Sequence, residues 1–317
     1  MFRNLLLFRF SPAVAADLDR LPEALDEHRL RPCGPLEAET RGFVPPVGRN
    51  HDDPLTRRLQ SRTFFTVGAE TKLLPSGVVN AELQRKVQKI GEEEGRKVGG
   101  RERKRLKEDL LNELLPKAFV QQSRMDGYVD SASGWVVLDT SSRKSAENSL
   151  TQIREALGSF PAVPLAPEEG PRMLMTDWLS NRTLPAGFSL GDEVELRDPA
   201  TATGAIAKCR RQDLDAEEVA EHLRNGKQVF QLGLVFADRL SFVLGEDLVV
   251  RKLKFLDVVL DALDGGETDA IGEFDATNTL LAGEVDSLLS RLATIFSIPR
   301  PSDGEARESQ DEPRKAA

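Results

Sequence analysis

Two narrow stripes of apolar residues in the middle of the chain are separated by glycines, and this pattern constrains the fold more than any other feature. The first stripe has helical spacing and consists of Val79, Leu83, Val87 and Ile90. The second consists of Leu106, Leu110 and Leu114. Between them lie Gly91, Gly95, Gly99 and Gly100, and a glycine costs a helix interior about 1 kcal/mol relative to alanine. The pattern predicts two helices joined as a hairpin with much exposed surface.

Strand-like and helical segments flank this hairpin in the first half of the chain. Alternating, β-branched or aromatic residues predict strands over 2–10, 63–67 and 135–139. Apolar residues at helical spacing predict helices over 13–28 and 141–157. The second of these helices ends at Gly158, and the Pro-rich stretch FPAVPLAPEEGP that follows is typical of a domain linker.

The second half of the chain predicts a further sheet packed with helices. Strands are expected in GFSLGDEVELRD and GAIAKCRRQDL, and a three-strand meander over 229–236, 240–244 and 248–255. A helix in AEEVAEHLRNGK is expected to be capped by Asp213 or Asp215 and to stop at Asn225-Gly226. A last helix is expected over about 282–296.

These segments together predict an α+β fold with mixed or antiparallel sheets, packed helices and a projecting helical hairpin. The expected division is a central α/β domain of residues 1–75 and 120–165, a basic helical hairpin of residues 76–119, and a C-terminal α+β base domain of residues 166–298. Residues 299–317 are too polar to pack and are expected to form a disordered tail.

Charge is distributed unevenly along this acidic chain, whose formal net charge is -9. Between Arg96 and Lys107 there are seven Lys and Arg residues against one acid, Glu102. Between Lys254 and Arg291 there are nine Asp and Glu residues and no Lys or Arg. Since the Debye length at physiological salt is about 8 Å, a distant acidic surface hardly cancels a basic one. The net charge is therefore compatible with a nucleic-acid partner.

Known catalytic and metal-binding patterns do not occur in the sequence. There is no GxxxxGK[ST] loop, no GxGxxG after a strand, no GxSxG elbow and no HExxH. Cys33 and Cys209 are too far apart for a metal knuckle or a disulfide framework. We expect no enzymatic activity, no cofactor and no metal, although a nuclease whose metal ligands come from distant segments stays open.

The apolar runs of the chain are far shorter than the roughly 20 residues of a membrane-spanning helix. The start, MFRNLLLFRFS, is interrupted by Arg9 and is interpreted as a first strand and not as a signal peptide. We therefore expect a cytoplasmic protein with no membrane partner.

The basic segments favour binding to a nucleic-acid backbone. Residues 84–107 contain no aromatic side chain, whereas non-specific single-strand binders use aromatic platforms for base stacking. A second basic group, Lys208 with Arg210 and Arg211, lies in the C-terminal half. This composition favours duplex DNA held without sequence preference. Two alternatives stay open: a merely solvated helix surface, and a protein-interaction scaffold whose basic hairpin docks an acidic protein partner.

A series of motifs spread over residues 1–296 resembles the recombination-associated protein RdgC family. The motifs, in order, are FRNLLLFRFS, RPCG, RGFVPPVG, LLPSGVVNAEL, LLPKAF, the GW-VVLDTSS strand, LGSFPAVPL, RRQDL and VVRKLKF. The resemblance implies a ring-shaped homodimer with a positively charged hole that encloses duplex DNA without sequence preference. It also implies association with the nucleoid, and functional competition with RecA that restrains RecA-promoted recombination.

The resemblance also implies roles for particular residues. Arg96 and Lys97 match the basic hairpin, and Arg211 with Gln212 matches a basic-Gln pair. The expected DNA-binding set is Lys72, Arg96, Lys97, Arg101, Arg103, Lys104, Lys208, Arg210, Arg211 and Gln212. Phe119 in LLPKAF matches an aromatic residue at the tip contact between subunits, and the alternative is that it belongs to the core of its own subunit. The glycine-rich hairpin loop departs from the family pattern.

Overall fold

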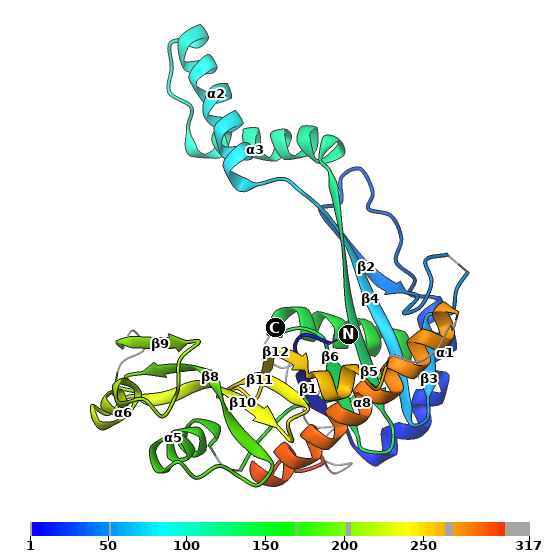
Figure 1. The fold of residues 1–317 in the computed structure, drawn as a ribbon. Coiled ribbons are helices and arrows are strands. Elements are labelled where there is room, and N and C mark those ends of the chain that lie inside the picture. Colours follow the sequence, from blue (N-terminus) through cyan, green and yellow to red (C-terminus); the bar gives the residue numbers. More distant parts are fainter. Residues whose placement is uncertain (1, 51, 169, 201–203, 264–268, 302–317) are drawn as a thin grey trace.

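Two antiparallel sheets and a long projecting arm make up the computed structural model, which describes residues 2–50, 52–168, 170–200, 204–263 and 269–301 (Figure 1). The first sheet has seven strands in the order β2-β4-β5-β6-β1-β7, with β3 paired to β4. The second has five strands in the order β12-β11-β10-β8-β9. Every ladder between these strands is antiparallel, so the expected α+β class is confirmed.

The first sheet is built from strands that the sequence pattern locates but does not delimit. Its strands are β1 (Leu6–Arg9), β2 (Glu39–Val44), β3 (Thr56–Leu59), β4 (Arg62–Lys72), β5 (Val120–Asp130), β6 (Trp135–Leu138) and β7 (Val163–Pro164). A 3-10 helix (Pro12–Arg20), α1 (Leu21–Asp26) and α4 (Arg143–Leu157) accompany it. The single helix predicted over 13–28 is thus two elements. The stretch interpreted as a linker contributes β7, which pairs with β1.

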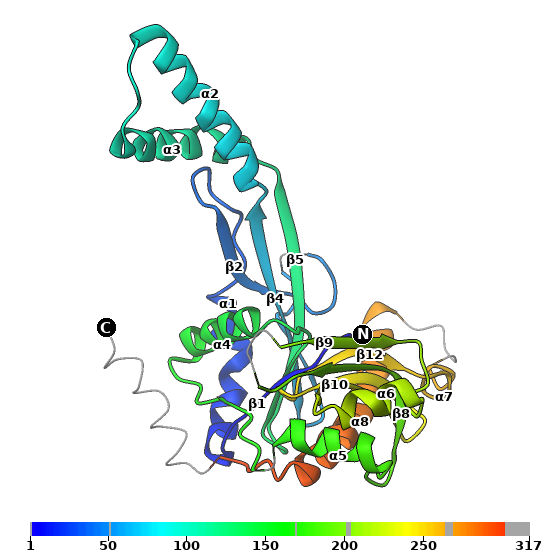
Figure 2. The same cartoon turned by 90° about the vertical axis from the view of Figure 1, so that its left-hand side faces the viewer.

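The arm consists of β4 and β5, which pair from Arg62↔Asp130 to Lys72↔Val120. Only one end of this ribbon lies in the core, since Val120 to Arg124 are exposed. The predicted strand 63–67 covers just the buried part. The ribbon continues because cross-strand hydrogen bonds satisfy the backbone even where no core covers the side chains. Figure 2 shows the ribbon rising from the body of the molecule and carrying the hairpin at its end.

The predicted helical hairpin is confirmed and consists of α2 (Ser76–Glu94) and α3 (Gly100–Leu114), followed by a short 3-10 turn (Leu115–Lys117). Val79, Leu83 and Leu110 form a small core of its own. Ile90, the last residue of the first predicted stripe, lies outside this cluster. Gly95 ends α2 with φ +65°, a left-handed conformation that favours glycine.

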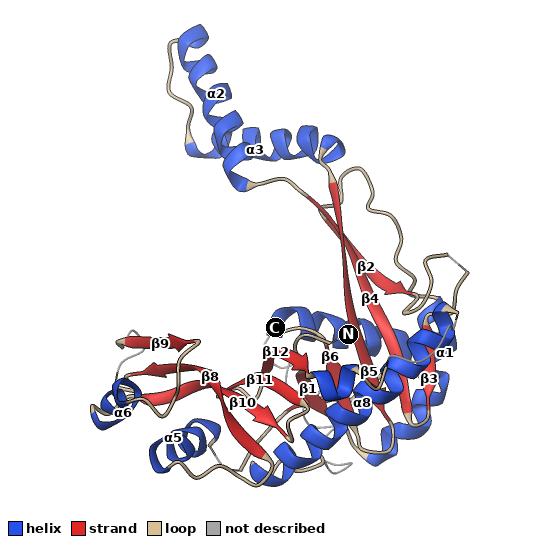
Figure 3. Cartoon of the chain, in the orientation of Figure 1, coloured by secondary structure: helices blue, strands red, loops and turns tan. Residues whose placement is uncertain are grey.

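The base domain contains the second sheet, whose meander is confirmed. Its strands are β8 (Phe188–Arg197), β9 (Ile206–Arg210), β10 (Gln228–Phe236), β11 (Leu240–Gly245) and β12 (Val250–Phe255). Its helices are α5 (Pro171–Asn181), α6 (Glu217–Arg224), α7 (Asp257–Leu260) and α8 (Ala270–Ile295), shown with the strands in Figure 3.

Two helix starts in the base domain differ from the prediction. The predicted cap of α6 is wrong, because Ala216 occupies the N-cap with no side-chain hydrogen bond. Asp213 instead accepts the N–H of Asp215 in the preceding turn at 2.9 Å. Helix α8 begins at Ala270, twelve residues before the predicted start at 282. Asp269 caps this start, because its carboxylate accepts the N–H of Gly272 at 2.8 Å.

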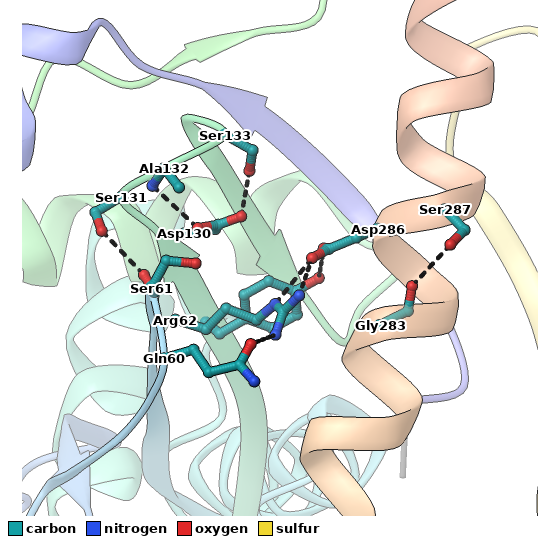
Figure 4. Close-up of polar contacts among 11 residues, drawn as sticks. Gln60, Ser61, Arg62, Asp130, Ser131, Ala132, Ser133, Gly283, Asp286 and Ser287 are labelled. Atoms are coloured by element: carbon teal, nitrogen blue, oxygen red, sulfur yellow. Dashed lines mark hydrogen bonds and ion pairs between the residues drawn. The ribbon is translucent and has the colours of Figure 1, made fainter.

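Helix α8 connects the base domain to the first sheet. Its Asp286 receives an ion pair from Arg62 and a hydrogen bond from the Tyr128 hydroxyl at 3.3 Å (Figure 4). Burial is the largest influence on the pKa of Asp286 and raises it, while the hydrogen bonds from Arg62 act in the opposite direction. Asp275, about three turns earlier in the helix and on the same face, pairs with Arg57 at 2.8 Å. The helix therefore holds the arm-bearing sheet and the base domain in one arrangement.

The two sheets also meet directly, through an antiparallel bridge between Leu5 and Val250 whose hydrogen bonds measure 2.8 and 3.0 Å. Near the chain end, Arg300 donates a hydrogen bond to the carbonyl of Ala132 at 3.0 Å. Residues 299–301 of the expected disordered tail are described, and residues 302–317 lie outside the described part of the chain. No helix in the described ranges is long and apolar enough to cross a membrane.

The overall shape resembles the letter C. In Figure 1 the arm forms its back, the hairpin of α2 and α3 forms its upper end, and β8, β9 and α6 form its lower end. In Figure 1 and Figure 2, α2 rises obliquely from the end of the arm, and α3 lies crosswise beside its lower half. Helix α3 and strand β9, which carry five of the predicted basic residues, border the same open side in Figure 1.

Candidate nucleic-acid interface

The hairpin carries an excess of positive charge that the arm separates from the acidic body. Residues 76–119 contain eleven Lys and Arg against eight Asp and Glu, a net charge of +3. With a total of -9, the remainder of the chain carries -12. Since screening limits charge interactions to about 8 Å at physiological salt, the hairpin presents its own potential to a partner.

Arg96 in the hairpin loop is held by two carboxylates. Its guanidinium donates to Glu94 at 2.6 Å and to both oxygens of Glu102 at 2.6 and 2.7 Å. These hydrogen bonds, chiefly those to Glu102 and then that to Glu94, raise the pKa of Arg96 above its ordinary value. The pairs close the loop between α2 and α3, and a phosphate would have to replace them. Exposed pairs of this kind are weak, so such an exchange costs little.

The other predicted hairpin residues are exposed. Lys97, Arg101 and Arg103 have no ion-pair partner within the described part of the chain, and Lys104 lies 3.9 Å from Glu108. The same helix exposes two further basic residues that the expected DNA-binding set omitted, Arg105 and Lys107. Both belong to the basic run between Arg96 and Lys107, and membership of this run was reason to include them in the expected DNA-binding set.

Lys72, also in the expected DNA-binding set, is bound to the backbone of two other segments. Its ammonium donates to the carbonyl of Pro35 at 2.7 Å and to that of Leu115 at 2.9 Å. An ammonium group has three N–H donors, so two of them bind the backbone at the junction of arm and hairpin. Lys72 therefore links the end of β4 to the turn that follows α3 and to the segment of Pro35.

The second basic group lies on β9 and is largely paired with β8. Lys208 binds Glu195 at 2.8 Å, and Arg210 lies 3.8 Å from Glu193. Each pair is directly opposite in the register of the two strands. The sequence contained a signal for this pairing: acids two positions apart in GDEVELRD and basic residues two positions apart in AKCR can face one another on adjacent strands.

Glu195 is the buried member of this group. Burial opposes its negative charge, but hydrogen bonds from Lys208 and Arg197 outweigh that effect and lower its pKa. Gln212 in the following turn donates to Glu218 at 3.2 Å. Arg211 adopts φ +53° in that turn and has no ion-pair partner in the residues that the structure describes.

Phe119 is exposed at the junction between hairpin and arm. Its side chain is 82% exposed, so the alternative that it belongs to its own subunit's core is wrong. Its carbonyl accepts the N–H of Leu73 at 2.8 Å, and Leu73 and Val120 are also exposed. These three residues form an apolar surface, the junction patch. A phenylalanine this exposed is typical of a surface that a partner covers.

No group of three or more His, Cys, Asp or Glu side chains in the described ranges lies close enough together to hold a metal ion. The observed features therefore define a class: an α+β protein that carries a basic helical hairpin and an exposed apolar patch at the end of a two-stranded arm.

Comparison with known proteins gives the family within this class. A family model described as "Putative exonuclease, RdgC" matches residues 1–298. "Recombination-associated protein RdgC" of Xanthomonas campestris pv. campestris (strain B100) is 51% identical over 300 residues, which cover 94% of this chain and 98% of that protein. The protein of the same name from Stenotrophomonas maltophilia (strain R551-3) is 47% identical, covering 94% and 99%. The chain belongs to the RdgC family, as its motifs predicted.

Proposed function

We propose that this protein binds duplex DNA without sequence preference, that two copies close into a ring around the duplex, and that the bound rings restrain RecA-promoted recombination. The observation that carries the proposal is the C shape, whose open side is bordered by the basic hairpin and by β9 (Figure 1). Membership of a family of recombination-associated proteins supports a DNA partner.

The composition of the hairpin supports recognition of the DNA backbone. Lys and Arg neutralise phosphates of any sequence, and the hairpin exposes them around α3. Residues 76–118 contain no Phe, Tyr or Trp, so the hairpin offers no stacking platform for unpaired bases. A duplex, whose phosphates face outwards, fits these groups best.

The junction patch supports a homodimer. A dyad that brings two junction patches together buries Phe119 from both copies, and burial of one such side chain stabilises by about 1.5–3 kcal/mol. The same dyad doubles the cationic surface that faces the open side. A duplex inside a closed ring can leave only at a DNA end or through an opened interface.

Direct titration of DNA tests the proposal. We expect similar fluorescence anisotropy isotherms for unrelated duplexes of equal length without magnesium, with a log–log salt slope of about -5 to -7 for six to eight phosphate contacts. Arg101→Gln and Arg211→Gln should weaken binding to all sequences alike. Arg31→Gln is the matched control, because Arg31 is an exposed arginine that pairs with Glu37 and lies outside the hairpin and β9. An absence of binding at low salt would refute the proposal and favour a scaffold that docks an acidic protein.

The ring and the effect on RecA need separate measurements. Phe119→Ala should lower the fraction of dimer in analytical ultracentrifugation and shorten retention on circular DNA, and the protein should slow RecA strand exchange on coated duplexes. Unchanged dimerisation and retention in that variant would exclude the junction patch as the contact. We propose no enzymatic activity, so duplex DNA incubated with the protein and magnesium should stay intact. We also propose a cytoplasmic, nucleoid-associated location, which fluorescence microscopy of a tagged chain would check.

A further inference from the structure

A hollow of about 780 Å³ lies beside the middle of the arm, between the segment of Arg29 and Leu30, the loop of residues 44–50, and strands β4 and β5, which are paired there at Gly68↔Arg124. The loop that follows β2 lies on the convex side of the arm in Figure 1, away from the open side that the hairpin and β9 border. The hollow is therefore separate from the DNA interface proposed above.

The charged residues that line the hollow are all positive, although the chain is acidic overall. Three of its lining residues are arginines, Arg29, Arg49 and Arg124, and none is Asp or Glu. Two carboxylates beside the hollow have partners of their own: Asp26 pairs with Arg29 at 2.8 Å, and Asp53 accepts the N–H of Asn50 at 2.9 Å. Three guanidinium groups around one concave surface create a local positive potential.

The arginines differ in how they are held. Arg29 donates to the carbonyl of Asp53 at 3.3 Å as well as to Asp26. Arg124, on β5, donates from one terminal nitrogen to the carbonyl of Pro45 and is otherwise exposed. Arg49 is exposed and has no ion-pair or hydrogen-bond partner within the described ranges. Since a guanidinium has five N–H donors, Arg49 and Arg124 keep donors for a ligand.

The floor of the hollow depends on a glycine. A Cβ at Gly68 would lie 2.8 Å from Val44 and 2.9 Å from Leu30, closer than real side chains approach. Glycine here lets Leu30 and Val44, which line the hollow together with Pro45, lie against β4. The hollow thus combines a cationic rim with an apolar wall.

We infer that this hollow is a second anion-binding site, which takes a phosphate group. Planar guanidinium forks match phosphate oxygens in bidentate fashion, and more than one arginine gives a phosphate monoester or diester several charge-assisted hydrogen bonds. The phosphate can come from a free phosphate compound or from a nucleic-acid strand. The inference does not depend on duplex binding at the hairpin.

Site-resolved protection of arginines tests the inference on the full chain. Mass spectrometry would measure how fast phenylglyoxal modifies each arginine, alone and with pyrophosphate, with a ten-nucleotide single strand, or with a decamer of glutamate. We expect pyrophosphate to slow modification of Arg49 and Arg124 at least fivefold and to leave Arg101 unchanged. Protection by the single strand alone would also support the site, with nucleic acid as the source. Protection by neither, or by polyglutamate alone, would overturn it.

A variant gives the second measurement. Arg49→Gln removes a side chain without a described partner, so it should fold normally. We expect it to weaken pyrophosphate binding in isothermal titration calorimetry at least fivefold and to leave duplex affinity within twofold. Unchanged pyrophosphate binding would refute the inference. Lost duplex affinity with unchanged pyrophosphate binding would instead place Arg49 in the DNA interface, and would refute it too.

Discussion

The small core of the hairpin makes Leu110→Ala a sharp test of how the arm presents its basic surface. Leu110 of α3 is 2% exposed and packs with Val79 and Leu83 of α2, and these are the fully buried apolar residues of the hairpin cluster. Since the hairpin stands at the end of the arm, no other described core cluster includes these side chains. We expect the substitution to act on the hairpin alone.

The expected magnitude follows from burial. Replacing a buried leucine by alanine costs about 2–5 kcal/mol, and about 1.4 kcal/mol corresponds to a tenfold change in an equilibrium constant. Local opening of the hairpin should therefore become about 30-fold to about 4,000-fold more frequent. For a core of three residues, a loss of this size is enough to leave α2 and α3 largely open while the sheets remain folded.

Hydrogen exchange read by mass spectrometry is the assay. Peptides from α2 and α3 should exchange faster by at least 30-fold, while peptides from β6 and α4 should not change. Val78→Ala is the matched control, because this residue lies in α2 beside Val79 and is 48% exposed. Equal acceleration in the sheets would refute the view that the hairpin unfolds on its own. No acceleration in α2 would refute the assignment of its core.

The remaining predictions concern charge. Glu195→Gln should free Lys208 for a phosphate and steepen the log–log salt slope of duplex binding by about 0.9, measured by anisotropy; an unchanged slope would show that Lys208 makes no contact. Asp286→Asn leaves Arg62 half-paired and should destabilise the chain by about 3 kcal/mol in urea unfolding, whereas an unchanged midpoint would show that α8 does not need this pair. Because Lys208 and Arg197 lower the pKa of Glu195 despite its burial, its stabilising contribution should be present above the unfolded pKa near 4.3 and be lost as pH falls further. Wild type and Glu195→Gln compared in urea at pH 7 and pH 3 would reveal the difference, and equal losses in both would contradict it.

Local patterns predicted most elements of the fold. The hairpin, the meander and α4 were confirmed because each rests on a periodic apolar face or on a glycine that ends a helix. Element boundaries were less accurate. The strand predicted over 63–67 continues to Lys72 because β5 and β2 pair with it. The paired residues are far apart in sequence, so a local pattern does not reveal this extension.

The sequence predicted only part of the candidate interface. The basic run predicted an exposed cationic hairpin, and the structure leaves most of its side chains exposed. The engagement of Lys72 with two carbonyls could not be predicted, because these belong to Pro35 and Leu115 on other segments. The exposure of Phe119 was likewise undetermined, since one aromatic residue after a helix fits a core as well as a surface.

The sequence by itself determined the kinds of elements, the uneven charge and the family, because these depend on neighbouring residues and on motif order. Only the tertiary structure decided which charges are available. It paired Lys208 and Arg210 with acids on β8, left Lys97 and Arg101 exposed to solvent, and gathered three arginines around one hollow beside the arm. The physical reason is that groups within a few ångströms of a charge decide whether it is neutralised or stays available to a partner. The tertiary fold brings these groups together, and their separation along the chain does not show which they are.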